Sequence, residues 1–195
     1  MRSAYEESDN VWPHDMEIRL QTVEPHILEL LFVRHVWALP NEPALPPLDP
    51  APVFNAEWVP VQSKQEMSDR WGRAWRDGWE WSRLARQAVG STAEDIQFSL
   101  GLPSRWPETE GWSQADRNGC EEWIAGLDLI QPGRETEENA VLSSLISAWR
   151  RRLLFIVVMP YQGAYASKLD DRTLAVSRHT HSDAHLYSEA LEGFV

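Results

Sequence analysis

Large apolar side chains recur at every fourth position in one stretch of the chain, and this spacing constrains the fold more than any other feature. The residues are Met67, Trp71, Trp75 and Trp79. Because an α-helix has about 3.6 residues per turn, side chains four apart lie above one another on one face. Ser63 and Glu66 form a capping box just before this stripe, and Gly90 suits the position after the last turn. We therefore predict a long helix over 63–89.

The run Leu153–Met159, LLFIVVM, is entirely apolar. It is too short to span a bilayer, which takes about 20 residues, and has the length of a buried strand. We read Thr173–Ser177 (TLAVS) as a second strand, Met16–Val23 as a third, and the stretch 160–172 between the first two as a loop. Long helices with few strands predict an α+β fold, with several helices packed on a small sheet that includes strands near 153–159 and 173–177.

The length of 195 residues suits a single domain over 1–195. We expect a loosely ordered N-terminus (1–15) and a proline-rich extended segment (40–60). That segment holds seven of the thirteen prolines, each of which fixes φ and lacks a backbone donor. Apolar residues such as Leu45 and Leu48 interrupt the prolines, so we expect the segment to pack against the body of the domain.

The charge of the chain limits the kinds of partner that it can bind. It carries 30 acidic and 18 basic side chains, for a net charge of −12. Most of the excess acid lies in 1–62 and 89–140, whereas 63–88 and 141–195 are nearly balanced. Nucleic-acid binding needs a basic face that neutralises phosphates, so we expect no nucleic-acid partner. An acidic surface instead favours a basic protein partner.

The chain shows no sign of secretion or membrane insertion. Its single cysteine, Cys120, rules out a disulfide within the chain. The acidic N-terminal sequence lacks the apolar segment of a signal peptide. We therefore expect a soluble, cytoplasmic protein that does not associate with membranes.

Eleven tryptophans make protein binding the leading hypothesis. Tryptophan offers a large apolar area and one N–H donor, and is therefore a frequent interface anchor. Trp71, Trp75 and Trp79 could form a docking face, although their helical spacing is more typical of a core. Trp106 and Trp112 stand in an acidic loop that contains prolines, and we expect them to be the better exposed. The predicted interaction residues are these five tryptophans.

A histidine cluster near the C-terminus supports an alternative. His179, His181, Asp183 and His185 could bind zinc, with imidazole and carboxylate ligands. The stretch superficially resembles the HxHxDH motif of the metallo-β-lactamase superfamily, but Ala184 stands between Asp183 and His185 and excludes that family. A simpler interpretation is a polar turn in which Asp183 or Ser182 caps a terminal helix over 184–191.

Polar residues after the first apolar strand form a further candidate, since loops at strand ends often carry sites. They are Tyr161, Gln162, Tyr165, Lys168, Asp170 and Asp171. We favour the interpretation that they form an ordinary exposed turn. The chain contains no Walker A loop, GxGxxG, HExxH or GxSxG motif, and we assign no catalytic residue.

These observations favour a non-catalytic protein-interaction protein, such as an adaptor, an inhibitor or an immunity-type partner of a basic protein, with no cofactor. The first alternative is a small metal-binding protein or hydrolase that uses zinc at the histidine cluster. The second is a structural subunit of a larger assembly.

Overall fold

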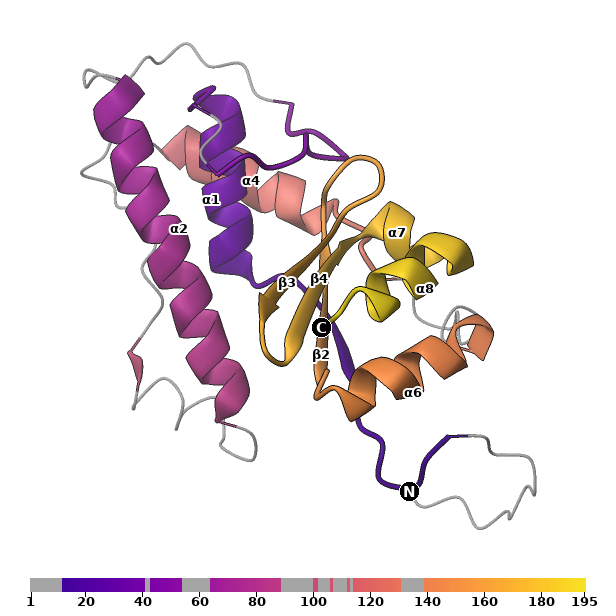
Figure 1. Ribbon diagram of the computed structural model, residues 1–195. Helices are drawn as coiled ribbons and strands as arrows, with labels where there is room; N and C mark the ends of the chain where they lie inside the picture. Colours follow the sequence, from indigo (N-terminus) through magenta and orange to yellow (C-terminus); the bar gives the residue numbers. More distant parts are fainter. Residues whose placement is uncertain are drawn as a thin grey trace.

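The computed structural model describes residues 12–40, 43–53, 64–88, 100–101, 106, 112, 114–130 and 139–195. Its helices are α1 (Pro25–Val36), α2 (Lys64–Gln87), α4 (Gln114–Ala125), α6 (Leu142–Arg150), α7 (Arg178–Ser182) and α8 (Ala184–Glu192). Its strands are β1 (Arg19–Thr22), β2 (Phe155–Met159), β3 (Ala166–Asp170) and β4 (Thr173–Ser177). The sheet lies between two groups of helices, with α1, α2 and α4 on one side and α6, α7 and α8 on the other (Figure 1). The predicted α+β fold is confirmed.

The sheet has the order β1-β2-β4-β3, in which β1, β2 and β4 are parallel and β3 is antiparallel to β4. Every residue of β2 and β4 is buried. The strand β2 was predicted from its continuous apolar run, as expected for a strand covered on both faces, and β4 was predicted from the segment TLAVS. The expectation of a loop over 160–172 is wrong in part, because β3 forms there. Its residues are exposed or half-buried, so this edge strand lacks the apolar run that marks β2.

The predicted long helix is confirmed as α2, which packs on α1. Trp71 is fully buried, and its Nε1–H donates to the backbone carbonyl of Leu30 at 2.6 Å. Gly78 sits at the point of close approach, where an added Cβ would lie 3.0 Å from Cδ1 of Ile27. Ser82 Oγ lies 3.1 Å from Nε2 of the buried His26. These contacts fix the position of α2 beside the sheet.

The C-terminal helices cover the other face of the sheet. Asp183 caps α8, since its carboxylate accepts the backbone N–H groups of His185 and Leu186 at 2.9 and 3.0 Å. The predicted terminal helix is therefore confirmed, and of its two predicted caps, Asp183 and Ser182, the structure shows Asp183. The short helix α7 was not predicted, and the Ser177 side chain caps it by accepting the N–H of Thr180.

Several expectations fall on residues that the structure does not describe. They concern the N-terminal residues 1–11, Ser63 of the capping box and Gly90. Parts of the proline-rich segment, 41–42 and 54–60, also lie outside the described residues. The described part, 43–53, forms no helix or strand and packs on the body through a bridge between Leu48 and Tyr161. None of the helices that the structure describes is long and apolar enough to cross a membrane.

Candidate functional site

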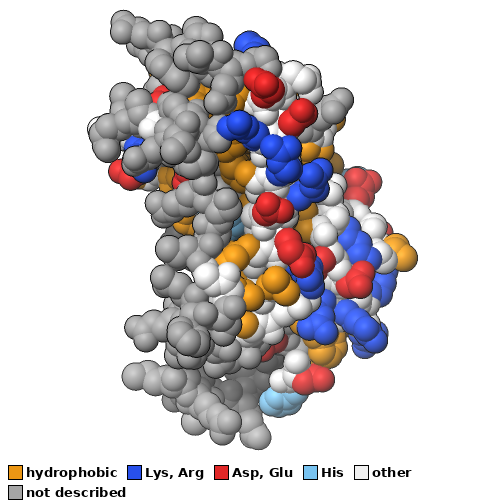
Figure 2. Space-filling model, turned by 90° about the vertical axis from the view of Figure 1, so that its left-hand side faces the viewer, with side chains coloured by type: hydrophobic (Ala, Val, Ile, Leu, Met, Phe, Trp, Pro, Cys, Tyr) orange, Lys and Arg blue, Asp and Glu red, His pale blue; other side chains and the backbone are white. Residues whose placement is uncertain are grey.

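A groove of about 470 Å³ runs between α2 and β3. One wall is the C-terminal half of α2, the other is β3 with the end of β2, and the proline-rich segment contributes Pro43–Leu45. The surface over α2 intersperses acidic, basic and hydrophobic side chains (Figure 2). The residues that line the groove include Leu45, Trp75, Arg76, Trp79, Glu80, Arg83, Arg86, Tyr161, Tyr165, Lys168 and Asp170.

One end of the groove is aromatic. Trp75 and Trp79 of α2 meet edge to face with ring centroids 5.6 Å apart. Tyr161 and Tyr165 make a second such pair, with centroids 4.7 Å apart. Aromatic walls of this kind bind apolar or aromatic groups through large contact areas. We call these four residues the aromatic end.

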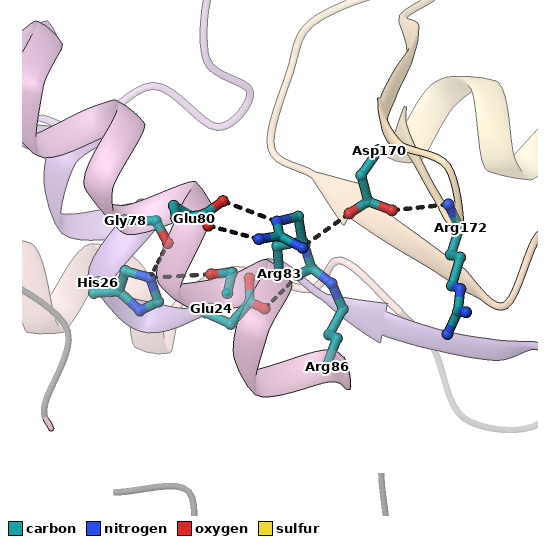
Figure 3. A network of polar contacts seen from close by, with 9 residues as sticks. Glu24, His26, Gly78, Glu80, Arg83, Arg86, Asp170 and Arg172 are labelled. Carbon is teal, nitrogen blue, oxygen red and sulfur yellow. Dashed lines mark hydrogen bonds and ion pairs between the residues drawn. The ribbon is translucent and has the colours of Figure 1, made fainter. Parts of the chain in front are cut away.

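The other end is charged, because α2 and β3 both bring ionised side chains there. Arg83 binds Glu80 with two hydrogen bonds of 2.8 and 2.6 Å, and this contact holds the pKa of Glu80 below its usual value. Arg86 lies 3.8 Å from the carboxylate of Asp170 on β3. Figure 3 shows these side chains turned toward one another. We call Glu80, Arg83, Arg86 and Asp170 the charged end.

Arg86 is a buried cation with acidic partners. Its side chain is 6% exposed and bonds the carboxylate of Glu24, at the start of α1, at 2.7 Å. It also lies over the ring of Trp79 at 5.9 Å. Removing one partner from a buried ion pair leaves an uncompensated charge, which is costly. Arg86 therefore ties α1, α2 and β3 together and fixes the width of the groove at this end.

Arg34 of α1 lies near the aromatic end and differs from Arg86. It is half-buried, stacks over Trp71 at 5.4 Å and makes no ion pair or hydrogen bond with the described residues. Burial lowers the pKa of Arg34, and the nearby Tyr161 hydroxyl opposes this effect. The Tyr161 hydroxyl is itself buried without a hydrogen-bond partner among the described residues. Burial raises the pKa of Tyr161, and Tyr165 has a smaller effect in the same direction. The positive charge of Arg34 counteracts this rise.

The outer edge of β3 offers backbone hydrogen-bonding groups. The Ser177 N–H donates to the carbonyl of Tyr165 at 3.0 Å, just before the β3–β4 ladder begins. Because bonded and non-bonded pairs alternate along an antiparallel ladder, the N–H and C=O groups of Ala166 and Lys168 point away from β4. No strand formed by the described residues pairs with that edge.

The structure places the predicted interaction tryptophans in two settings. Trp71 is part of the core between α1 and α2, whereas Trp75 and Trp79 line the groove. The expectation that Trp106 and Trp112 are exposed is wrong, since they are 3% and 5% exposed. Trp112 packs edge to face on Phe32 of α1. Trp106 packs edge to face on Trp37, the residue directly after α1. Although their loop is acidic in sequence, Trp106 and Trp112 are buried, because their large apolar rings pack against neighbouring apolar surface.

No tryptophan among the described residues is exposed. The expected exposed tryptophan patch beside acidic residues is therefore not found in the part of the chain that the structure describes. The half-buried tryptophan at the groove, Trp79, takes its place as the accessible aromatic surface.

The histidine cluster does not converge on one point. His179 and His185 are exposed, His181 is buried with its ring 4.9 Å from that of Tyr187, and Asp183 caps α8. Hydrogen bonds from the capped backbone hold the pKa of Asp183 below its usual value. Within the described residues, no three histidine, cysteine or acidic side chains group as metal ligands would. The geometry supports the capping interpretation of this stretch.

Comparison with models of protein families, with curated proteins and with solved structures found no match. The site must therefore be interpreted from its own residues. Sequence reasoning had selected Tyr161, Tyr165, Lys168 and Asp170 as a possible loop site, and all four line the groove. It missed Arg34 and Arg86, since single arginines on helices give no signal before the packing of those helices is known.

Proposed function

We propose that this protein is a non-catalytic interaction protein that binds an extended segment of a partner protein in the groove between α2 and β3. The bound segment would pair with the outer edge of β3 and place alternate side chains into the groove. This is strand addition, in which backbone hydrogen bonds supply affinity and side-chain pockets supply specificity.

One observation carries the proposal: the outward backbone groups of β3 lie directly beside a groove with aromatic walls. An edge strand with free N–H and C=O groups is a template for pairing with another chain. The groove borders four residues of β3, Ser167 to Asp170, and a strand rises about 3.3 Å per residue. A segment of about five residues that pairs from Ala166 onward would therefore reach both outward pairing positions and fill the groove, and large apolar side chains would contact Trp79 and Tyr165.

The acidic composition supports a finer proposal about the partner. Residues 1–62 and 89–140 carry most of the excess acid of the chain. This charge would steer a partner with a basic surface toward the protein. The single cysteine, Cys120, is buried and unbridged, which agrees with a cytoplasmic site of action.

A selection from a displayed library of random peptides, with the full-length chain as bait, tests the proposal. We expect the enriched peptides to alternate apolar and polar residues and to compete with one another. Ala166→Pro removes one outward N–H without touching the ladder to β4, and proline is tolerated at strand edges. It should weaken these peptides about fivefold or more, the value of one backbone hydrogen bond.

Ala166→Ser is the matched control, because it changes the side chain and keeps the N–H. It should bind the selected peptides as the unmodified chain does. The proposal fails if no peptide family is enriched, or if Ala166→Pro binds the selected peptides as tightly as Ala166→Ser.

A further inference from the structure

Arg34 is a partly desolvated cation for which the described residues supply no anion. Its guanidinium packs over Trp71, and its Nε atom is buried without a hydrogen-bond partner. A buried polar group costs free energy unless it is hydrogen-bonded, and a buried charge costs more unless it is paired. An arginine kept in this condition therefore needs an explanation.

The Tyr161 hydroxyl repeats this pattern beside Arg34. The residue is 3% exposed, and its oxygen has no hydrogen-bond partner among the described residues. Leu48, which lines the same hollow as Arg34, pairs with Tyr161 in a β-bridge, and the positive charge of Arg34 counteracts the rise in the pKa of Tyr161 that burial causes. Two unsatisfied donors, one cationic and one neutral, thus stand together near the aromatic end of the groove.

Arg34 is reached from a second hollow, of about 320 Å³, which adjoins the groove at Leu45. Leu45 lines both spaces, so a ligand at the aromatic end can extend past it toward the guanidinium. The other lining residues of this hollow include His35, and its remaining walls are largely apolar. No acidic residue lines it among those described.

We propose that Arg34 and Tyr161 form a binding site for a carboxylate. A guanidinium and a hydroxyl donor match the acceptor lone pairs of a carboxylate, and the hydrogen bonds between them are charge-assisted. Beside the site, the aromatic end would hold an apolar group attached to that carboxylate. The ligand class is therefore an apolar or aromatic carboxylate.

This inference goes beyond the proposed function, because the carboxylate site does not require a strand to be added to β3. Within that function, the carboxylate would come either from the C-terminus of a partner or from an aspartate or glutamate side chain. Both sources present the same group to Arg34.

Thermal unfolding with phenylacetate as the probe tests the site, and phenylacetamide serves as its neutral isostere. We expect phenylacetate to raise the melting temperature of the full chain saturably, by roughly 3–6 °C at about ten times its Kd. Phenylacetamide should have less than half this effect. Arg34→Met should abolish the shift, and Tyr161→Phe should reduce it.

Arg83→Met is the matched control, since it removes a groove arginine that Glu80 already binds. It should keep the full response to phenylacetate. The inference is overturned if phenylacetate has no effect, if phenylacetamide equals it, or if Arg34→Met responds as Arg83→Met does.

Two dipeptide probes separate the sources of the carboxylate. Acetyl-Ala-Phe carries only a terminal carboxylate, and acetyl-Asp-Phe-amide carries only a side-chain carboxylate. The probe that stabilises the chain more identifies the source, and failure of both contradicts the site. Ala166→Pro should retain the phenylacetate response. A variant that loses peptide binding but keeps this response would therefore test strand addition to β3 separately from the carboxylate site.

Discussion

The two buried or half-buried arginines near the groove differ in their counter-charges, although the Nε atom of each is buried without a hydrogen-bond partner among the described residues. Arg86, at the charged end, is bonded by Glu24 at 2.7 Å and lies 3.8 Å from Asp170. Arg34, near the aromatic end, has a tryptophan face and an unbonded tyrosine hydroxyl beside it, and no carboxylate among the described residues. The first arginine has its counter-charges within the fold, whereas the second does not.

This difference assigns a structural role to Arg86 and a binding role to Arg34. A buried arginine with its own acids holds helices and strands in place, and the fold depends on it. An arginine that lacks an acid contributes little to folding and is available to a ligand. Variants at the two ends should therefore have different consequences, with large losses of stability at the charged end and losses of binding at the aromatic end.

Glu24→Gln should have the largest effect on stability. It removes the negative charge bonded to the 6% exposed Arg86. We expect the free energy of unfolding to fall by about 3 kcal/mol, as for other broken buried pairs. Chemical denaturation measures this loss. Glu80→Gln is the control, because the Glu80–Arg83 pair is solvent-exposed and should contribute little. Equal losses in the two variants would contradict the structural role of Arg86.

Gly78→Ala tests the helix packing that both ends of the groove share. An added Cβ would lie 3.0 Å from Ile27 Cδ1 and 3.4 Å from the His26 ring. We expect a loss of about 1–3 kcal/mol, as for other overpacked interfaces. Gly72→Ala, on the same helix with nothing within 4 Å, should instead gain about 1 kcal/mol from helix propensity. A gain in both variants would show that α2 does not approach α1 this closely.

The free energy of unfolding should fall at alkaline pH because the Tyr161 hydroxyl is buried. Burial raises the pKa of Tyr161 above its ordinary value of 10.0, so the folded chain keeps a proton that the unfolded chain loses. Stability from this group is therefore complete below pH 10 and declines as the pH rises further, by about 1.4 kcal/mol per pH unit. Urea unfolding between pH 9 and 11, values chosen to bracket roughly the ordinary pKa, should show a shallower decline for Tyr161→Phe. An identical decline would place this hydroxyl in water.

Arg34→Met should have the smallest effect on folding. Methionine keeps apolar contact with Trp71 and removes a charge that no described acid compensates. We expect the free energy of unfolding at neutral pH to stay the same or to rise by up to about 1 kcal/mol. Arg86→Met is the matched comparison and should lose stability, because it leaves Glu24 without its cation. If Arg34→Met loses as much as Arg86→Met, the two arginines have the same role.

The elements with a strong periodic or apolar pattern were predictable from the sequence. The four-residue spacing of Met67, Trp71 and Trp75 predicted α2, a continuous apolar run predicted β2, and the short segment TLAVS predicted β4. Asp183 was also predicted, as one of two candidate caps of α8. In each case the signal is local, so neighbouring residues alone determine the structure. The edge strand β3 was missed because one face of it remains open and its side chains are mixed.

The groove was less predictable, because it depends on contacts between residues far apart in the chain. Tyr161, Tyr165, Lys168 and Asp170 were selected as loop residues, but no local signal joined them to α2. The exposure of Trp106 was predicted wrongly for the same reason, since its cover comes from Trp37 beyond α1. The difference between Arg34 and Arg86 likewise emerges only when the distances to Glu24 and Asp170 are known.

The most direct test of the two-ended groove is a nitrogen–proton correlation spectrum of isotope-labelled protein, which resolves the Nε–H groups of the arginines. Phenylacetate is added stepwise, and the cross-peaks of Arg34 and Arg86 are followed. We predict that the Arg34 cross-peak shifts saturably while the Arg86 cross-peak stays in place. If the Arg86 cross-peak shifts and that of Arg34 does not, or if neither moves, the assignment of a binding end and a structural end is contradicted.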